Sequence, residues 1–193
     1  MKYFITLLIA FQAVFIMAQS TVSSINMELP AIEIRNLNPG DQITVPVIMK
    51  NRLPSGQTLG GMCIGFQLFI SIDTTVLLWN GTKGTKNGVV DFHPLCPYSS
   101  VDWLFNLNKG GQIACLWQDP KLVGQDFPDD IVLFKLGFTY LGGLKEEQST
   151  PLQWGKEAVI EEGIMLKGKT DAFSSSLKPY DNVILVDGSI TRK

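Results

Sequence analysis

The stretch from Met62 to Asp73 constrains the fold more than any other part of the chain. Its alternate positions are all apolar: Met62, Ile64, Phe66, Leu68, Ile70 and Ile72. Successive side chains of a β-strand point to opposite faces, so this pattern predicts a central strand with one face in a core. The intervening positions form a smaller and more mixed surface, suited to meeting a partner: Cys63, Gly65, Gln67, Phe69 and Ser71.

Residues 1–18 have the pattern of a secretory signal peptide. Lys2 stands near the start, an apolar run covers residues 3–17, and the small residue Ala18 ends it. A membrane span needs ~20 apolar residues, so a transmembrane anchor is the weaker interpretation. We therefore predict cleavage after Ala18, secretion to the extracellular space or the periplasm, and no membrane insertion. The remaining residues, 19–193, suit a single domain with a sizeable core.

The rest of the sequence consists of short strand patterns separated by turns. Strands are predicted at 25–34 (interrupted by Pro30), 43–49, 62–72, 89–92, 101–107, 112–118, 131–141, 150–154 and 183–192. The clearest hairpin joins two of these strands through Asn108-Lys109-Gly110-Gly111. Residues 74–79 form either a helical turn or a further strand. Because helical patterns are few, the sequence predicts an all-β fold, a nine-stranded two-sheet β-sandwich.

Charge and cysteine content exclude several function classes. The formal net charge is −2, so no strong positive field favours nucleic acid or anionic lipid. Three cysteines follow the signal peptide, Cys63, Cys96 and Cys115, and their spacing matches no zinc pattern. An odd number leaves at least one thiol outside an intramolecular disulfide. Buried thiols are the simplest interpretation.

Catalytic patterns are weak. The one histidine, His93, stands three residues before Cys96 in a proline-containing segment, which indicates a surface loop rather than an activated nucleophile. The acidic pair Glu146-Glu147 consists of neighbours, which point apart on a strand and do not face each other across a glycosidic bond. Further acidic residues show no EF-hand spacing: Asp119, Asp126, Asp129 and Asp130. We predict no catalytic residues, no metal site and no cofactor.

Five blocks of sequence, in order, resemble the cohesin family: NPGDQITVPVIMKN, IGFQLFISIDTTVL, GGQIACLWQD, IVLFKLGFTYLGG followed by TPLQW, and VDGSITRK. Together these blocks span most of residues 25–193. The resemblance implies a jelly-roll-like sandwich of the carbohydrate-binding-module and cohesin superfamily. It also implies a secreted, non-catalytic module that binds dockerins. Dockerins are small helical modules with their own calcium, attached to enzymes of polysaccharide degradation.

By the same resemblance, the partner lies across the sheet that contains strands 62–72, 101–107, 112–118 and 150–154. The residues expected to contact it are Gln67, Phe69, Leu116, Gln118 and Asp119. The alternation of strand 112–118 does not decide whether Ala114, Leu116 and Gln118 or the opposite row faces outward. Phe69 would be the central anchor, and the loop that begins at Asp119 would form the rim. In the cohesin arrangement strands 62–72 and 112–118 are neighbours, so Cys63 and Cys115 are a candidate disulfide. The connections at 80–100 and 163–182 are longer than the family usually has.

Two other functions remain open from the sequence. A carbohydrate-binding module would stack sugars on a coplanar row of exposed aromatic side chains, and the candidates are Trp79, Trp103, Trp117 and Trp154. Tryptophan more often packs in a core, so two or three of the four are expected to be buried. A structural or adhesive protein of the cell envelope is the other alternative.

Two short motifs concern modification. Asn80-Gly81-Thr82 fits the N-glycosylation acceptor pattern. Asp73-Thr74-Thr75 resembles an O-glycosylation acceptor of some exported bacterial proteins, but a helix N-cap, with Asp73 accepting the backbone N–H groups that follow, is the simpler interpretation.

Overall fold

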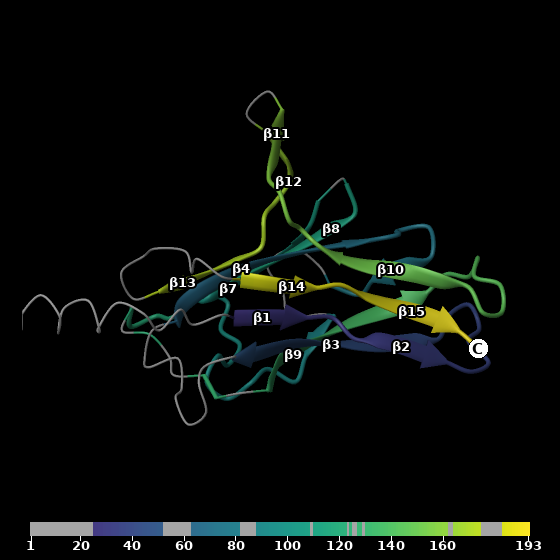
Figure 1. Cartoon of the computed structure of the whole chain (residues 1–193), viewed down its shortest axis with the longest axis horizontal. Coiled ribbons are helices and arrows are strands. Elements are labelled where there is room, and N and C mark those ends of the chain that lie inside the picture. The colour runs from purple at the N-terminus through teal and green to yellow at the C-terminus, as the bar shows by residue number, and fades with distance from the viewer. Residues whose placement is uncertain are drawn as a thin grey trace, which may run out of the picture.

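The computed structural model describes residues 25–51, 63–81, 88–108, 110–122, 124, 127–128, 130–161, 164–174 and 183–193. The predicted signal peptide, Asp126 and Asp129 lie outside the described residues. Two β-sheets pack face to face as a sandwich (Figure 1). The all-β sandwich predicted from the sequence is confirmed. No helix among the described residues is long and apolar enough to cross a membrane.

The first sheet, sheet A, has the order β14-β1-β3-β9-β5, with β6 also paired to β9. Its strands are β14 (Val183–Val186), β1 (Ile25–Glu28), β3 (Gln42–Asn51), β9 (Ile131–Tyr140), β5 (Leu77–Trp79) and β6 (Val89–Val90). Alternate residues of β3 are buried in the core: Ile43, Val45, Val47 and Met49.

The second sheet, sheet B, has the order β2-β15-β10-β4-β8-β7, with β13 also paired to β4. Its strands are β2 (Ala31–Ile34), β15 (Gly188–Arg192), β10 (Ser149–Trp154), β4 (Cys63–Ile72), β8 (Gln112–Gln118), β7 (Trp103–Leu107) and β13 (Asp171–Ser174). The stretch on which the sequence prediction was built is β4, and it lies inside the sheet as predicted. A separate hairpin of β11 (Val159–Glu161) and β12 (Ile164–Lys167) rises from this side of the sandwich (Figure 1).

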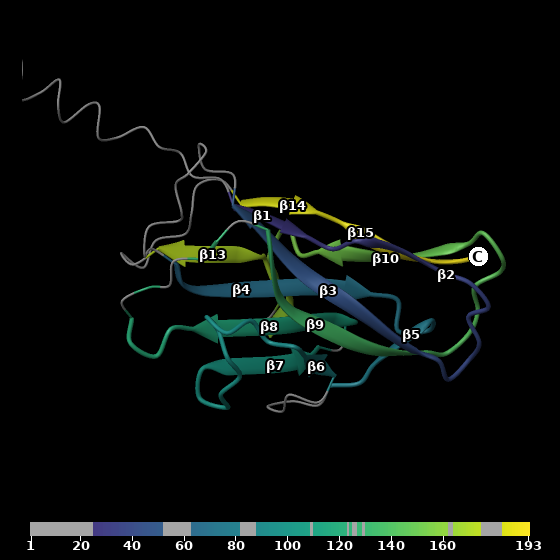
Figure 2. The ribbon, with the colours of Figure 1, turned by 90° about the horizontal axis from the view of Figure 1, so that it is seen from below.

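Both ends of the described chain cross from one sheet to the other. Pro30 separates β1 in sheet A from β2 in sheet B, because proline has no N–H to continue the ladder. The C-terminal strand divides in the same way, and β14 and β15 run parallel to β1 and β2 (Figure 2). Gly188 permits this second crossing, since a side chain there would collide with the backbone of Leu29 and Pro30. Two predicted strands, 25–34 and 183–192, are therefore four shorter ones.

Aromatic residues fill the centre of the core beneath β4. The ring centroid of Phe66 lies 4.9 Å from that of Trp117 and 5.8 Å from that of Trp103. Trp103 stacks on Phe105 at 5.1 Å and meets Phe134 of the opposite sheet edge-on at 5.3 Å. Such pairs add to the stability that burial of large side chains provides. The alternate residues of β4 from Phe66 onward are thus core residues, as predicted.

The predicted apolar row is wrong at the start of β4. Cys63 joins the core, whereas Ile64 lines a pocket on the outer face of sheet B. Opposite β13, Gly65 pairs with Phe173 and Cys63 with Ser174, which leaves Ile64 as an extra residue in a bulge. A bulge shifts the alternation by one residue, so the side chains before it exchange faces. Met62 lies outside the described residues.

The predicted disulfide between Cys63 and Cys115 is also wrong. Cys115 pairs across the sheet with Leu68, five positions along β4 from Cys63. At ~3.3 Å per residue the two cysteines stand roughly 16 Å apart along the strand, far beyond the ~7 Å that a disulfide spans. All three cysteines are buried thiols. Burial raises the pKa of Cys115, and burial together with the nearby Cys63 raises the pKa of Cys96 to about 12.

Candidate functional site

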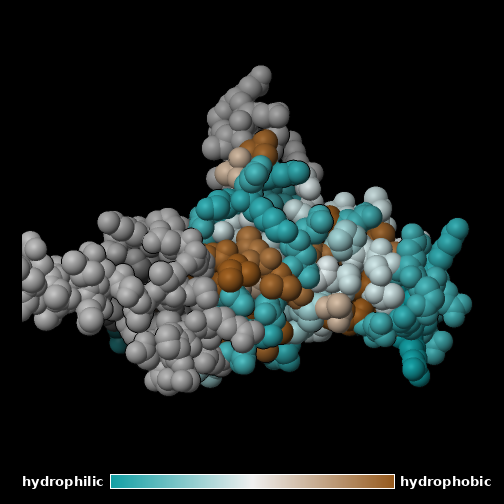
Figure 3. Space-filling view, viewed as in Figure 1, coloured by the Kyte–Doolittle hydropathy of each residue, from teal (hydrophilic) through white to brown (hydrophobic). Residues whose placement is uncertain are grey.

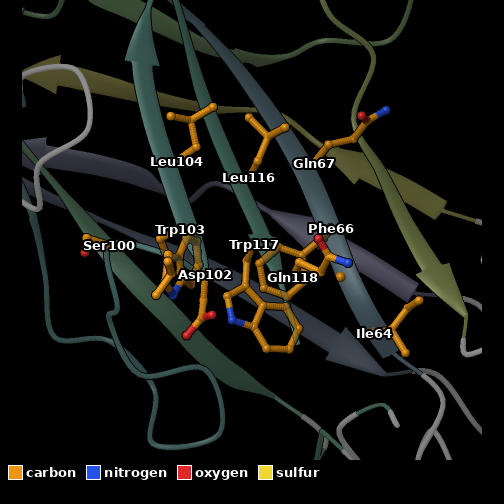
Figure 4. Close-up of a pocket in the computed structure, with 12 residues that line it drawn as sticks. Ile64, Phe66, Gln67, Ser100, Asp102, Trp103, Leu104, Leu116, Trp117 and Gln118 are labelled. Atoms are coloured by element: carbon orange, nitrogen blue, oxygen red, sulfur yellow. The ribbon is translucent and has the colours of Figure 1, made fainter. Parts of the chain in front are cut away.

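The outer face of sheet B carries an open surface on β7, β8 and β4. Leu104 of β7 pairs with Leu116 of β8, which pairs in turn with Gln67 of β4. In Figure 4 these three side chains point the same way, whereas Trp103, Trp117 and Phe66 lie toward the core. Gln118 and Gly65 pair in the row next to them. Alternation along each strand therefore places one apolar row in the core and a second row outside.

A pocket of about 430 Å³ lies over this row (Figure 4). Leu104 and Leu116 form its apolar part, and Val101 borders it with 90% of its surface exposed. Leu104 itself is 46% exposed. Asp102 is the one charged residue among the described residues that line the pocket. The site is therefore a shallow apolar depression with one carboxylate at its border.

The turn between β7 and β8 fixes the register of this surface. The Asn108 side-chain oxygen accepts the backbone N–H groups of Gly110, at 3.0 Å, and Gln112, at 2.9 Å. Gly111 has a φ of +72°, a conformation that favours glycine. The turn predicted from Asn108-Lys109-Gly110-Gly111 is confirmed, and it sets Leu104 opposite Leu116.

Three of the five predicted contact residues lie on this surface. Gln67 and Leu116 are partly exposed, Gln118 is exposed, and all three line the pocket. The Gln67 amide donates to the backbone oxygen of Lys169 at 3.1 Å, which holds that side chain in place. The strand that could not be oriented from sequence, β8, presents Leu116 and Gln118 outward, with Cys115 and Trp117 in the core.

Phe69 corrects the prediction most clearly, since it was expected to be an exposed anchor and is only 7% exposed. The chain between β10 and β13 covers it. Gly168 lies against the Phe69 ring so closely that a β-carbon at that position would overlap the ring. Gly155 donates its N–H to the Phe69 oxygen at 2.7 Å, and the Thr170 hydroxyl accepts the Phe69 N–H at 2.9 Å. Phe69 faces outward as predicted, but another part of the chain occupies the surface above it.

Asp119 is likewise not available to a partner, because its side chain is 1% exposed. Its carboxylate accepts the backbone N–H of Gly124 at 2.9 Å and that of Lys121 at 3.3 Å. Asp119 thus fixes the conformation of the loop that follows β8. Any contact that this loop makes at the edge of an interface would come from other residues of the loop. The residues that the sequence prediction missed are Val101, Asp102 and Leu104. The alternation of Leu104 with the buried Trp103 and Phe105 was the signal that pointed to the last of these.

A second, polar depression of about 280 Å³ lies on the other side of the β11–β12 hairpin. Gln112, Ser71 and Gln153 pair across β8, β4 and β10 and contribute to its floor. Lys156 and Asp187 also line it and are joined by an ion pair of 2.6 Å. The outer face of sheet B therefore has an apolar part and a polar part, separated by the base of the hairpin.

The described residues offer no activated nucleophile in the one histidine–cysteine pair. His93 accepts the backbone N–H of Leu95 through Nδ1 at 3.2 Å, while the Cys96 thiol lies near the Leu133 oxygen at 4.0 Å. The raised pKa of Cys96 is the opposite of what a reactive thiolate needs. Burial lowers the pKa of His93, so the imidazole is neutral at neutral pH.

The four tryptophans bear on sugar binding. Trp79, Trp103, Trp117 and Trp154 are all at most 4% exposed, so more of them are buried than the two or three expected. No tryptophan among the described residues can therefore form a stacking platform for sugar rings.

Another apolar patch lies at the edge of sheet A (Figure 3), where Ile184 and Val186 of β14 are exposed. Residues 175–182, which precede β14, lie outside the described residues, so no site is assigned to this edge.

No family model and no curated protein match this sequence, but solved structures do. One is the sixth cohesin of scaffoldin B from Acetivibrio cellulolyticus, in complex with a mutant Cel5 dockerin. It has a TM-score of 0.62 at 17% identity, over 88% of this chain and 99% of that chain. The Coh-OlpA–Doc918 complex from Clostridium thermocellum, a type I cohesin–dockerin complex, matches with a TM-score of 0.61 at 17% identity, over 88% and 99% of the two chains. The protein has a cohesin-like fold.

A type II cohesin domain from the cellulosome of Acetivibrio cellulolyticus shares this cohesin-like fold, with a TM-score of 0.54 at 14% identity, over 88% of this chain and 95% of that chain. The fold implied by the five sequence blocks is therefore confirmed. At these identities the similarity establishes the architecture, and the residues that meet a partner must be argued from this chain's own surface.

Proposed function

We propose that this protein is a secreted, non-catalytic binding module that recognises a dockerin-type helical module through the outer face of sheet B. The cohesins that share its fold include several in complex with dockerins. The observation that carries the proposal is the outward pair of Leu104, which is exposed, and Leu116, which is partly exposed, on paired strands of the sheet. Apolar groups at the centre of an interface supply affinity, and polar groups around them set the register.

Export by the predicted signal peptide and a role in polysaccharide degradation belong to the same proposal. Any calcium would reside in the dockerin. Direct sugar binding is less well supported, because the four tryptophans are buried.

The test is titration calorimetry against a panel of recombinant, calcium-loaded dockerin modules, including those encoded by the source organism. We expect at least one to bind, and calcium removal with EDTA to abolish binding. Leu116→Asp should weaken that binding by ~2 kcal/mol or more, because it places a charge at the apolar centre. Leu78→Asp is the matched control, since Leu78 is 50% exposed on the opposite sheet.

Both variants must first show the wild-type melting temperature. If every dockerin in the panel fails to bind, the proposed function is wrong. If a dockerin binds and Leu116→Asp has no more effect than Leu78→Asp, the partner uses another surface.

A further inference from the structure

The strand beside β4 in sheet B is interrupted in its middle. β10 pairs with β4 up to Trp154 opposite Ile70, and β13 resumes the pairing at Asp171 opposite Gln67. Between them the chain leaves the sheet at Gly155, forms the β11–β12 hairpin, and returns at Thr170. The Thr170 N–H donates to the Gly155 oxygen at 2.7 Å, which closes the base of the hairpin.

The base of the hairpin is fixed firmly across the outer face. Gly168 donates its N–H to the Gln112 side-chain oxygen at 2.7 Å, and Gln112 is a buried residue of β8. Gly168 also packs directly on the Phe69 ring of β4. The base of the hairpin thus covers both β4 and β8 and divides the outer face of sheet B into two parts. Figure 1 shows the hairpin standing out from the sandwich above this point.

The two parts of the outer face on either side of the hairpin base differ in polarity. The β7 and β13 side holds the apolar pocket with Leu104 and Leu116, whereas the β10 side holds the polar depression with the Lys156–Asp187 pair. A rigid helix laid over the whole face would collide with the hairpin. A helix on the apolar side alone would bury an aliphatic residue. It would leave the Lys156–Asp187 ion pair in contact with water and so avoid the cost of desolvating the two charges.

We infer that the partner docks only on the apolar side of the hairpin, a conclusion that rests on the proposed function. The partner is a helical module that packs an aliphatic side chain on the paired Leu104 and Leu116 and presents a cationic or N–H group to Asp102.

The test uses the full mature chain and whichever recombinant, calcium-loaded dockerin of the panel binds most tightly. Leu104→Asp should weaken its affinity at least ~30-fold, as loss of a central anchor does. Gln153→Trp adds bulk to the exposed floor of the polar depression and should leave the affinity within ~3-fold of wild type. Leu78→Asp is the control for a charge placed on an exposed leucine elsewhere.

Hydrogen–deuterium exchange of the wild-type complex gives an independent readout that needs no variant to fold. Protection is expected in β7 and β8, and none at 153–157. A Gln153→Trp effect larger than ~3-fold, or protection at 153–157, overturns the inference while the proposed function stands. Unchanged affinity for both Leu104→Asp and Gln153→Trp overturns the surface assignment itself. Failure of the whole panel overturns both.

Discussion

The outer faces of the two sheets are built from similar strands but leave different groups available. On sheet A, Gln42, Thr139 and Asn80 close a ring of hydrogen bonds of 3.0, 2.7 and 2.7 Å. Lys50 pairs with Glu28 on the same face. On sheet B the outward row contains Leu104 and Leu116, which line a pocket. Polar groups that satisfy one another gain little from a partner, whereas exposed apolar groups gain by burial. Leu78 and Ile184 of sheet A are exposed as well. Leu104 and Leu116 together line a pocket, and this combination of outward apolar side chains with a pocket favours sheet B as the binding face.

The comparison of the two outer faces assumes that both sheets pack on the same rigid core. The variant with the largest expected loss of stability tests this assumption. Phe66→Ala removes a fully buried ring that contacts Trp103 and Trp117 beneath the pocket. We expect a loss of ~3–5 kcal/mol in the free energy of unfolding, from lost burial and the cavity left behind. Denaturant titration gives the value, with Leu78→Ala as the surface control, expected within ~0.5 kcal/mol. A loss near that of the control would remove β4 from the core.

Much of this architecture could be predicted from the sequence, because alternation and turn residues act locally. The pattern of β4 identified Phe66 and Leu68 as core residues, and Asn108 with Gly111 marked the hairpin. The exposure of Phe69 could not be predicted, because alternation says which face a side chain takes but not what covers that face. Its cover comes from Gly168, about a hundred residues further along the chain.

The burial of Asp119 and the bulge at Ile64 escaped prediction for related reasons. The Asp119 carboxylate is occupied by backbone N–H groups of its own loop, a geometry that no periodic pattern records. At Ile64 one extra residue opposite β13 shifts the alternation, and only the register of the two strands shows it. The hairpin at 159–167 was missed because each of its strands is very short.

The second prediction tests how the hairpin base packs on the outer face of sheet B, where the Phe69 ring leaves no room for a side chain at residue 168. Gly168→Ala would drive a β-carbon into the Phe69 ring, so we expect a loss of ~1–3 kcal/mol in stability from overpacking. Gly137→Ala on β9 of sheet A is the matched control, because a β-carbon there meets its nearest neighbours at 3.6 Å, an ordinary contact. Equal stabilities of the two variants would show that the hairpin base is not packed on Phe69 as described.

The third prediction concerns the hydrogen-bonded ring of sheet A. Gln42→Ala removes the donor to Thr139 and the acceptor for Asn80. Because the ring is partly exposed, we expect a loss of ~1 kcal/mol or less in the free energy of unfolding. Dockerin affinity should not change, since these residues lie on the opposite face. A change in affinity comparable to that of Leu116→Asp would break the distinction between the two faces.

The smallest effect is expected at the turn that joins the two sheets, between β4 and β5. The Asp73 carboxylate accepts the Thr75 hydroxyl at 2.6 Å and the Thr75 N–H at 2.9 Å. It therefore caps the backbone as predicted, but a turn and a strand follow it in place of the predicted helix. These bonds hold the pKa of Asp73 below its ordinary value. A carboxyl whose pKa is lowered on folding stabilises the folded state above its unfolded pKa of ~3.9, and that contribution is lost as the pH falls through the folded pKa.

Asp73→Asn keeps the hydrogen-bond acceptor and removes the charge. Its stability should therefore be slightly below wild type at pH 7, and the difference should vanish well below pH ~4. Denaturant titration at both pH values measures the difference, and an NMR titration of the Asp73 carboxyl measures its pKa directly. A folded pKa at or above the ordinary value of 3.8 would contradict the capping role. Because the group is exposed, the effect is small even if every bond forms as described.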